Sequence, residues 1–134
     1  MKDNNTLHLV LKKKWYELIE SGIKKEEYRE IKPYWIKRLW YNPTFDKNGR
    51  VIEKKPITDW TINTCKERNI DLIEMAHKGN MLPKDFNTVC FHLGYTGTKI
   101  FFQIKNIIID IGKEEWGAEK NKQYFVIKLG DRIL

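Results

Sequence analysis

The sequence predicts an α+β fold, a small β-barrel with surrounding helices. The predicted helices all fall in the first 80 residues, whereas the last third of the chain is rich in strands. The length of 134 residues suits a single domain over residues 1–134. Hydrophobic residues make up 41% of the chain and aromatic residues 13%, which is enough for a core without disulfides.

The first predicted elements are a strand and a helix. The run "TLHLVL" at 6–11 is a short apolar strand. Trp15, Leu18 and Ile19 follow at spacings of three and four, which places them on one face of a helix. Gly22 then suits the left-handed position that ends many helices.

A second strand and a second helix come next. The run "KKEEYREI" at 24–31 has no helical periodicity and is predicted to be a strand. Pro33 suits the first turn of a helix, in which Trp35, Ile36 and Leu39 would face inward.

The middle of the chain predicts an insertion. Residues 41–60 contain Asn48-Gly49, a hairpin turn signal between two polar runs. We therefore expect a protruding hairpin or long loop around 41–60. Residues 59–80 predict one or two short helices that stop at Gly79.

The last third predicts three strands. They cover 87–94, 98–112 and 122–130, and the second is long enough to contain a bend. The segment "KEEWGAEKN" is predicted to be the loop that joins the last two strands.

Composition limits the classes of function. The net charge of +7 favours acidic partners such as nucleic acid or nucleotides, although it also serves solubility alone. No apolar run is long enough to span a membrane, and the N-terminus lacks the features of a signal peptide, so we expect a cytoplasmic protein.

Cysteine and histidine are few and scattered. Cys65 and Cys90 form no CxxC pattern, so reduced thiols are expected. His8, His77 and His92 show no zinc-binding spacing, and the sequence predicts neither a metal site nor a cofactor.

The stretch "SGIKKEEYREIKPYW" at 21–35 combines charges with aromatic residues. Glu27 and Arg29 are two apart, so on a strand they project to the same face, and Lys24 leaves the turn just before it. Glu27 could hold either cation by charge-assisted hydrogen bonds, and the cations could meet a phosphate. The alternative is a plain cluster of surface ion pairs, which contributes little.

Four of these residues spell G-x-K-x-x-E-x-R: Gly22, Lys24, Glu27 and Arg29. The pattern resembles the signature of the ASCH domain family, which also follows the first helix. The resemblance covers about residues 6–40 and, more loosely, 87–132. It implies a PUA-like fold with a cleft beside the signature that binds RNA, a nucleotide or a modified nucleoside.

The resemblance also implies a possible enzyme. Some small bacterial ASCH proteins are amidohydrolases that deacylate N4-acetylcytidine, using the signature lysine, a threonine and a further glutamate. This sequence has Glu27 where those enzymes have threonine. In an enzyme, Lys24 would activate a nucleophile or stabilise an oxyanion, and Glu27 or Glu114 would act as general base.

Further candidates surround the signature. Tyr28 and Trp35 could offer stacking faces for a base. Trp116 could cap the cleft, or it could simply plug one end of the barrel. The loop that contains Tyr95 could bind phosphate through backbone amides, but it is more often a turn. His92 could line a cleft or serve as a structural histidine.

Three interpretations therefore remain open. The favoured one is an RNA- or nucleotide-binding domain whose ligand contacts Gly22, Lys24, Glu27, Tyr28, Arg29, Trp35, Tyr95 and Trp116. The second is a nucleoside amidohydrolase. The third is a protein-interaction module that uses the hairpin at 41–60, and no membrane partner is expected.

Overall fold

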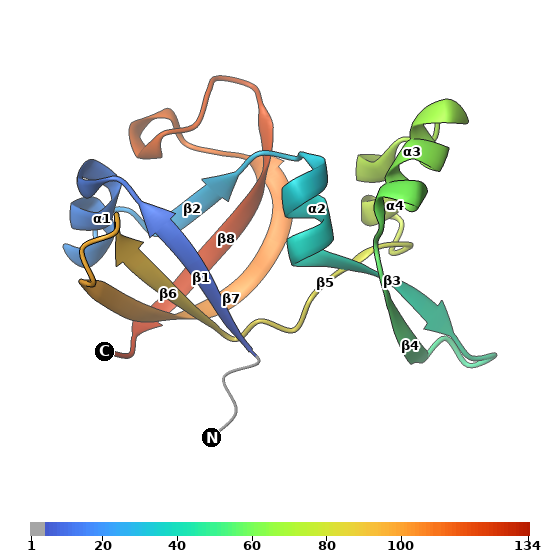
Figure 1. Ribbon diagram of the computed structural model, residues 1–134, viewed down its shortest axis with the longest axis horizontal. Coiled ribbons are helices and arrows are strands. Elements are labelled where there is room, and N and C mark those ends of the chain that lie inside the picture. Colours follow the sequence, from blue (N-terminus) through green and yellow to red (C-terminus); the bar gives the residue numbers. More distant parts are fainter. Residues whose placement is uncertain (1–4) are drawn as a thin grey trace. The chain divides into compact units, whose positions relative to one another are not determined.

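The computed structural model describes residues 5–134, and it divides the chain into two compact units. The sheet unit comprises the chain up to Glu30 together with Asp85–Leu134, and the hairpin unit comprises Ile31–Lys84. Strands and helices occur in both units (Figure 1), which confirms the α+β class. The predicted insertion at 41–60 falls inside the hairpin unit. No helix in the described part of the chain is both long and apolar enough to cross a membrane.

The sheet unit contains one five-stranded sheet. Its strands are β1 (Thr6–Leu11), β6 (Thr88–Leu93), β7 (Lys99–Ile111), β8 (Gln123–Arg132) and β2 (Glu26–Arg29), in that order across the sheet. β1 and β6 are parallel, and all other neighbours are antiparallel. The sheet curls strongly around its core (Figure 1). The strands predicted at 6–11, 87–94, 98–112 and 122–130 are confirmed to within two residues at each end.

A side chain joins the two edges of this curled sheet. β1 and β2 are the edge strands, and the Arg29 Nη2 donates a hydrogen bond to the Val10 carbonyl at 3.1 Å. Two irregularities in the β7–β8 register, on either side of Ile104, help β7 to bend. The sheet thereby becomes a half-barrel with a packed inner face.

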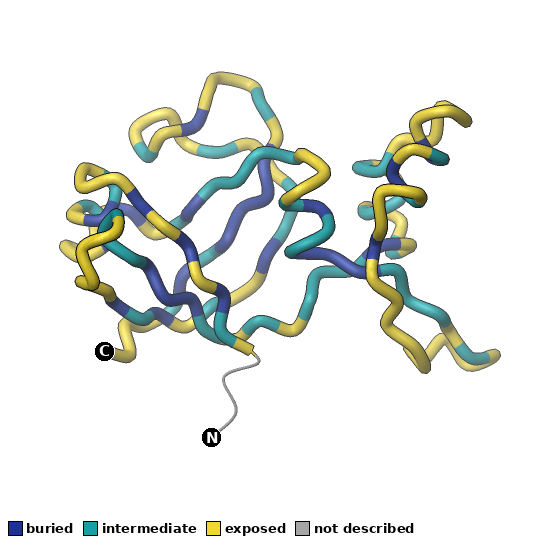
Figure 2. The backbone as a smooth tube through the Cα atoms, in the orientation of Figure 1, coloured by how far each residue is buried: buried dark blue, intermediate teal, exposed yellow. Residues whose placement is uncertain are grey.

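Buried residues run along the strands of the sheet unit (Figure 2), and most of its core lies on that inner face. Its fully buried side chains include Leu7, Leu9, Val89, Phe91, Ile100, Phe125 and Ile127. They come from four strands, and β1 shows the alternation of buried and exposed residues expected of a strand with one covered face.

Helix α1 (Lys13–Glu20) packs against this unit through Tyr16 and Ile19, which are buried. The sequence placed Trp15, Leu18 and Ile19 on one helix face, and of these Ile19 is buried whereas Trp15 and Leu18 are half-buried. The helix ends in a Schellman motif. The Ile23 N–H donates to the Leu18 carbonyl and the Gly22 N–H to the Ile19 carbonyl. Gly22 has a φ of 83°, which is the left-handed conformation that its position predicted.

The hairpin unit contains three short helices and three short strands. Its elements are α2 (Pro33–Leu39), β3 (Trp40–Phe45), β4 (Val51–Pro56), α3 (Asp59–Glu67), α4 (Leu72–His77) and β5 (Leu82–Pro83). Strand order is β4-β3-β5. Pro33 opens α2, as predicted, and Ile36 and Leu39 are buried whereas Trp35 is only half-buried. The Thr58 and Asp71 side chains cap α3 and α4.

The predicted hairpin is confirmed. The Asp46 carboxylate accepts hydrogen bonds from the backbone amides of Asn48 and Arg50, and Gly49 takes a φ of 81° at the turn. Every residue of β4 is exposed, and β4 is an edge strand. Unpaired backbone groups on such an edge can pair with another chain, so a protein-interaction role for the hairpin stays a prediction.

Candidate functional site

The candidate site is built where α1 ends and β2 begins. The turn at Gly22 delivers Lys24 to the entrance of β2. Within β2, Glu27 pairs with Ile127 and Arg29 with Phe125, both of which are fully buried. Because paired residues project to the same face, Glu27 and Arg29 point into the half-barrel. The shared face that the sequence predicted is therefore the inner face, not a solvated one.

Lys24, Glu27 and Arg29 form a single ion-pair network. The Lys24 Nζ lies 3.0 Å from Glu27 Oε1, and the Arg29 Nη2 lies 2.7 Å from Glu27 Oε2. Lys24 is only 3% exposed and Glu27 only 6%. The network brings two cations to one carboxylate, so a net positive charge is held inside the protein. Such a network differs from a surface ion pair because its charges have lost most of their hydration.

Lys24 has additional partners in the loop between β7 and β8. Its ammonium donates to the Trp116 carbonyl at 2.6 Å and lies 4.4 Å from the centre of the Trp15 ring. Burial lowers the pKa of Lys24 below its ordinary value, and the charge and hydrogen bond of Glu27 partly oppose that shift.

The same loop is anchored on Tyr28. The Tyr28 hydroxyl donates to Glu26 Oε1 at 2.8 Å and accepts from the Lys113 N–H at 3.0 Å. Gly117, in the loop, has a φ of 103°, and a Cβ there would lie 3.0 Å from the Trp15 ring. Tyr28 therefore serves as a support for the loop that covers Lys24. Tyr28 projects from the face of β2 opposite Glu27, and stacking of a base on its ring stays a prediction.

The ionisation of Tyr28 is expected to lower the stability of the fold at alkaline pH. Burial, followed by the bond to Glu26, raises the pKa of Tyr28 well above its ordinary value of 10.0, although the Lys113 hydrogen bond opposes this. The unfolded chain therefore loses this proton first, and the free energy of unfolding should fall as pH rises above about 10. Lys24 contributes the opposite slope, because its pKa is lowered on folding.

Comparison with Tyr28→Phe isolates the tyrosine contribution. Urea titrations at several pH values above about 10 should show a shallower loss of stability in the variant than in the wild type. Tyr95→Phe removes the same group from a residue that is 97% exposed and serves as the control. Equal slopes in Tyr28→Phe and the wild type would contradict the assignment.

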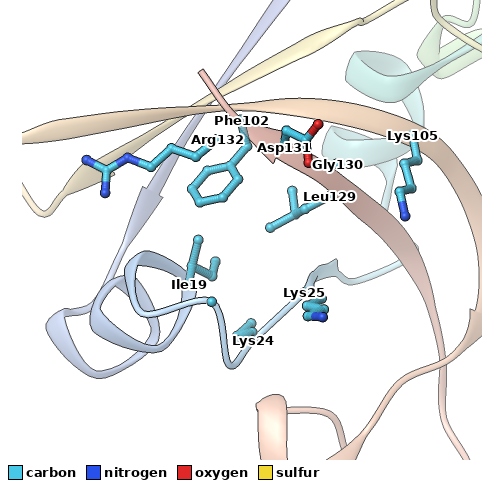
Figure 3. Close-up of a pocket in the computed structure, with 10 residues that line it drawn as sticks. Ile19, Lys24, Lys25, Phe102, Lys105, Leu129, Gly130, Asp131 and Arg132 are labelled. Atoms are coloured by element: carbon cyan, nitrogen blue, oxygen red, sulfur yellow. The ribbon is translucent and has the colours of Figure 1, made fainter. Parts of the chain in front are cut away.

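A pocket of about 380 Å³ opens beside Lys24 (Figure 3). Its walls come from the end of α1, the signature turn and the bulged parts of β7 and β8. The lining residues are Ile19, Gly22, Lys24, Lys25, Phe102, Lys105, Leu129, Gly130, Asp131 and Arg132. Four of them are cations and one is an anion, so the pocket is strongly basic.

The structure gathers some of the predicted site residues and leaves others apart. Gly22 and Lys24 line the pocket. Glu27 and Arg29 lie behind Lys24 in the ion-pair network, and Tyr28 and Trp116 border Lys24 from the other side.

Three predicted residues lie outside this group. Trp35 belongs to the hairpin unit. Tyr95 is exposed in the turn between β6 and β7. Glu114 is exposed at the start of the short 3₁₀ helix Glu114–Trp116, and its carbonyl accepts from the Gly117 N–H. None of the three is among the pocket-lining residues.

Sequence reasoning missed the cations on the far wall. Lys105 lies between Ile104 and Asn106, where the register of β7 against β8 shifts. It is the extra residue of this irregularity, and a bulge changes the direction in which such a side chain points. Arg132 extends the last strand beyond its predicted end at residue 130. Gly130 is the sequence feature that could have drawn attention to this region, because a glycine inside a strand often marks a close approach of another segment. In the structure, a Cβ at position 130 would lie 3.2 Å from Gln103.

A second cluster of ligand-bearing side chains lies elsewhere in the sheet unit. His8, Cys90 and His92 bring one nitrogen or sulfur atom each to within 4.8 Å of one another. These are the residues whose spacing in the sequence predicted no metal site.

Comparisons of the chain with family models, with curated proteins and with solved structures found no match. The assignment of a function therefore rests on the geometry of the site and on the resemblance of residues 22–29 to the ASCH signature.

Proposed function

We propose that the protein is an ASCH-type domain of PUA-like fold that binds RNA or a nucleotide in the basic pocket beside Lys24. The observation that carries this proposal is the composition of the pocket. Lys24, Lys25, Lys105 and Arg132 converge on it from three separate segments, against the single carboxylate of Asp131. Phosphate is the anion that such a group of amines and a guanidinium suits best.

The size and the apolar part of the pocket support the same ligand class. A volume of about 380 Å³ lies within the usual range for small-molecule sites. Phe102, Leu129 and Ile19 lie together on one side, with Lys105 and Arg132 to either side of them (Figure 3). A phosphate on the cations would place an attached nucleoside against this apolar surface.

The buried network supports the charge of the pocket from behind. Glu27 is shared by two cations, so Lys24 keeps part of its positive field although its ammonium is already bonded. We assign Lys25, Lys105 and Arg132, which are exposed, the direct contacts with phosphate. Lys24 and Arg29 would shape the site electrostatically.

The test uses the three exposed cations. Fluorescence anisotropy of a labelled, mixed-sequence single-stranded RNA is titrated with the wild type and with Lys25→Ala/Lys105→Ala/Arg132→Ala. The variant should bind at least about tenfold more weakly at low salt, and the slope of log affinity against log salt should be less steep by about 2. Lys47→Ala/Lys55→Ala/Lys66→Ala also removes three positive charges, but from the hairpin unit, and is the matched control.

The outcomes separate the ligands. Equal losses in both triple variants would indicate non-specific attraction to charge and would sink the pocket assignment. If only the pocket variant loses affinity for a mononucleotide, and RNA binding is unchanged, the function would be restricted to nucleotides. No binding of either ligand by the wild type would overturn the proposal.

A second candidate is the hydrolysis of an acylated nucleoside such as N4-acetylcytidine. The observation that favours it is Lys24, a buried lysine of lowered pKa held by a carboxylate. Lys24 would activate a nucleophile or stabilise an oxyanion, and Glu27 or Glu114 would act as general base. Release of cytidine by the wild type and its loss in Lys24→Met would support this candidate, and the absence of turnover in the wild type would remove it.

A further inference from the structure

A group of metal-ligating residues forms on two neighbouring strands, away from the signature. His8 on β1 is the register partner of Cys90 on β6, and His92 lies two residues beyond Cys90. All three project from the face opposite Leu7, Leu9 and Phe91 of these strands, because side chains alternate along a strand. Parallel pairing of β1 with β6 is therefore what collects three ligands from distant parts of the sequence.

The two distances from His92 to the other ligand atoms are close to those in a coordination sphere. The His8 Nδ1 lies 3.0 Å from the His92 Nε2, and the Cys90 Sγ lies 3.4 Å from the same His92 nitrogen. In tetrahedral zinc sites, bond lengths of about 2.0 Å to nitrogen and 2.3 Å to sulfur imply ligand separations of about 3.3 Å and 3.5 Å. All three ligand atoms lie within 4.8 Å of one another, so side-chain adjustments can close the cluster around one ion.

The chemistry of the ligands selects the metal. Two imidazoles and a thiolate form a soft to borderline set that suits zinc, whereas calcium and magnesium prefer oxygen ligands. The group found among residues 5–134 has three members, so one tetrahedral position is left for water or a small ligand. His8 is exposed, and solvent can therefore reach this side of the cluster.

We propose that His8, Cys90 and His92 bind one Zn²⁺ ion. Cys90 loses its thiol proton to solvent as the S–Zn bond forms. One imidazole donates its N–H in the His8–His92 hydrogen bond. On metal binding this ring changes tautomer and carries its proton on its other nitrogen, so that His8 Nδ1 and His92 Nε2 both offer a lone pair to the ion. The bound ion would join β1 to β6 by a link in addition to their backbone hydrogen bonds.

One charged neighbour opposes the ion. Lys99 on β7 is the register partner of His92, and its charge faces the same side of the sheet. Its ammonium lies 5.8 Å from the centre of the Phe101 ring. Lys99→Met removes a repulsion without removing a ligand, so it should tighten zinc binding.

Cobalt and zinc titrations of the intact chain test the proposal. The protein is stripped with a chelator, kept reduced and titrated with Co²⁺, whose thiolate complexes absorb by ligand-to-metal charge transfer. One equivalent should bind with this absorption, and Zn²⁺ should displace it. Competition with a chromophoric chelator then gives the zinc affinity.

The chain supplies matched controls for both kinds of ligand. Cys90→Ala should lose the charge-transfer band, whereas Cys65→Ala, which removes a buried cysteine in the hairpin unit, should keep it. His8→Ala should weaken zinc binding by at least about 100-fold, more than the usual loss of an outer-shell partner, and His77→Ala should leave it unchanged. His8 and His77 are both exposed, so neither substitution threatens the fold.

Three results would overturn the proposal. One is the absence of stoichiometric zinc binding by the reduced wild type at micromolar concentration. Another is a charge-transfer band that survives in Cys90→Ala, provided that circular dichroism shows a folded protein. If Cys90→Ala does not fold, unchanged zinc affinity in His8→Ala would decide against the site by itself.

Discussion

Glu27→Ala is expected to lower the free energy of unfolding by about 3–5 kcal/mol. The substitution removes the carboxylate that lies 3.0 Å from the Lys24 ammonium and 2.7 Å from the Arg29 guanidinium. Two cations would then remain inside the half-barrel without a counter-charge, and neither can regain full hydration. Urea denaturation at neutral pH measures the loss.

Two variants test the cause of that loss. Glu53→Ala removes the carboxylate of an ion pair with Lys55 whose side chains are both more than half exposed, and it should cost no more than about 1 kcal/mol. Lys24→Met/Glu27→Leu/Arg29→Met replaces the whole network by apolar side chains and should recover most of the stability. A loss in Glu27→Ala no larger than in Glu53→Ala would show that the network is solvated.

Gly112→Ala is expected to cost about 1–3 kcal/mol by overpacking the base of the loop that covers Lys24. A Cβ at position 112 would lie 2.6 Å from the Ala118 Cβ and 2.9 Å from the Tyr28 ring. Neither neighbour is the free end of a flexible side chain, so the backbone of the loop must shift. Thermal or urea unfolding measures the cost.

A double-mutant cycle identifies the contact. Ala118→Gly deletes the methyl group that the new Cβ would meet, so Gly112→Ala/Ala118→Gly should be more stable than the sum of the two single losses predicts. Additive losses would mean that the clash with Ala118 is relieved in another way. Because the loop also supplies the carbonyl that binds Lys24, the affinity of the pocket should change along with the stability of Gly112→Ala.

Local features of the fold could be predicted from the sequence. The helix before Gly22 and the hairpin at Asn48-Gly49 were predicted, since a turn with a positive φ leaves a clear mark in a few neighbouring residues. The side-by-side projection of Glu27 and Arg29 was predicted from strand alternation. The burial of these charges was not predicted, because it depends on β8 and on the loop near Trp116. Both segments lie about a hundred residues further along the sequence.

Features that depend on pairing between distant strands could not be predicted. Lys105 faces the pocket because of a register shift, and the nearby Gly130 does not by itself reveal where the register changes. The His8–Cys90–His92 cluster exists only because β1 lies beside β6 in one particular register. Sequence spacing reveals metal sites whose ligands lie on one turn or hairpin. Here the ligands come from strands that are far apart in the sequence, so no spacing pattern identifies them.

The order of chain synthesis gives the strand arrangement a further consequence. Thr6 pairs with Thr88, and Glu27 pairs with Ile127 in the last strand. At about 5–20 residues per second, a ribosome takes roughly 4–16 s to make the 80 or so residues between the partners of β1 and β6. The hairpin unit, which is continuous in the sequence, has all its strands while β1 and β2 still wait for theirs. A nascent chain therefore carries Lys24, Glu27 and Arg29 in water until β8 has been made, and the network closes only when β8 pairs with β2.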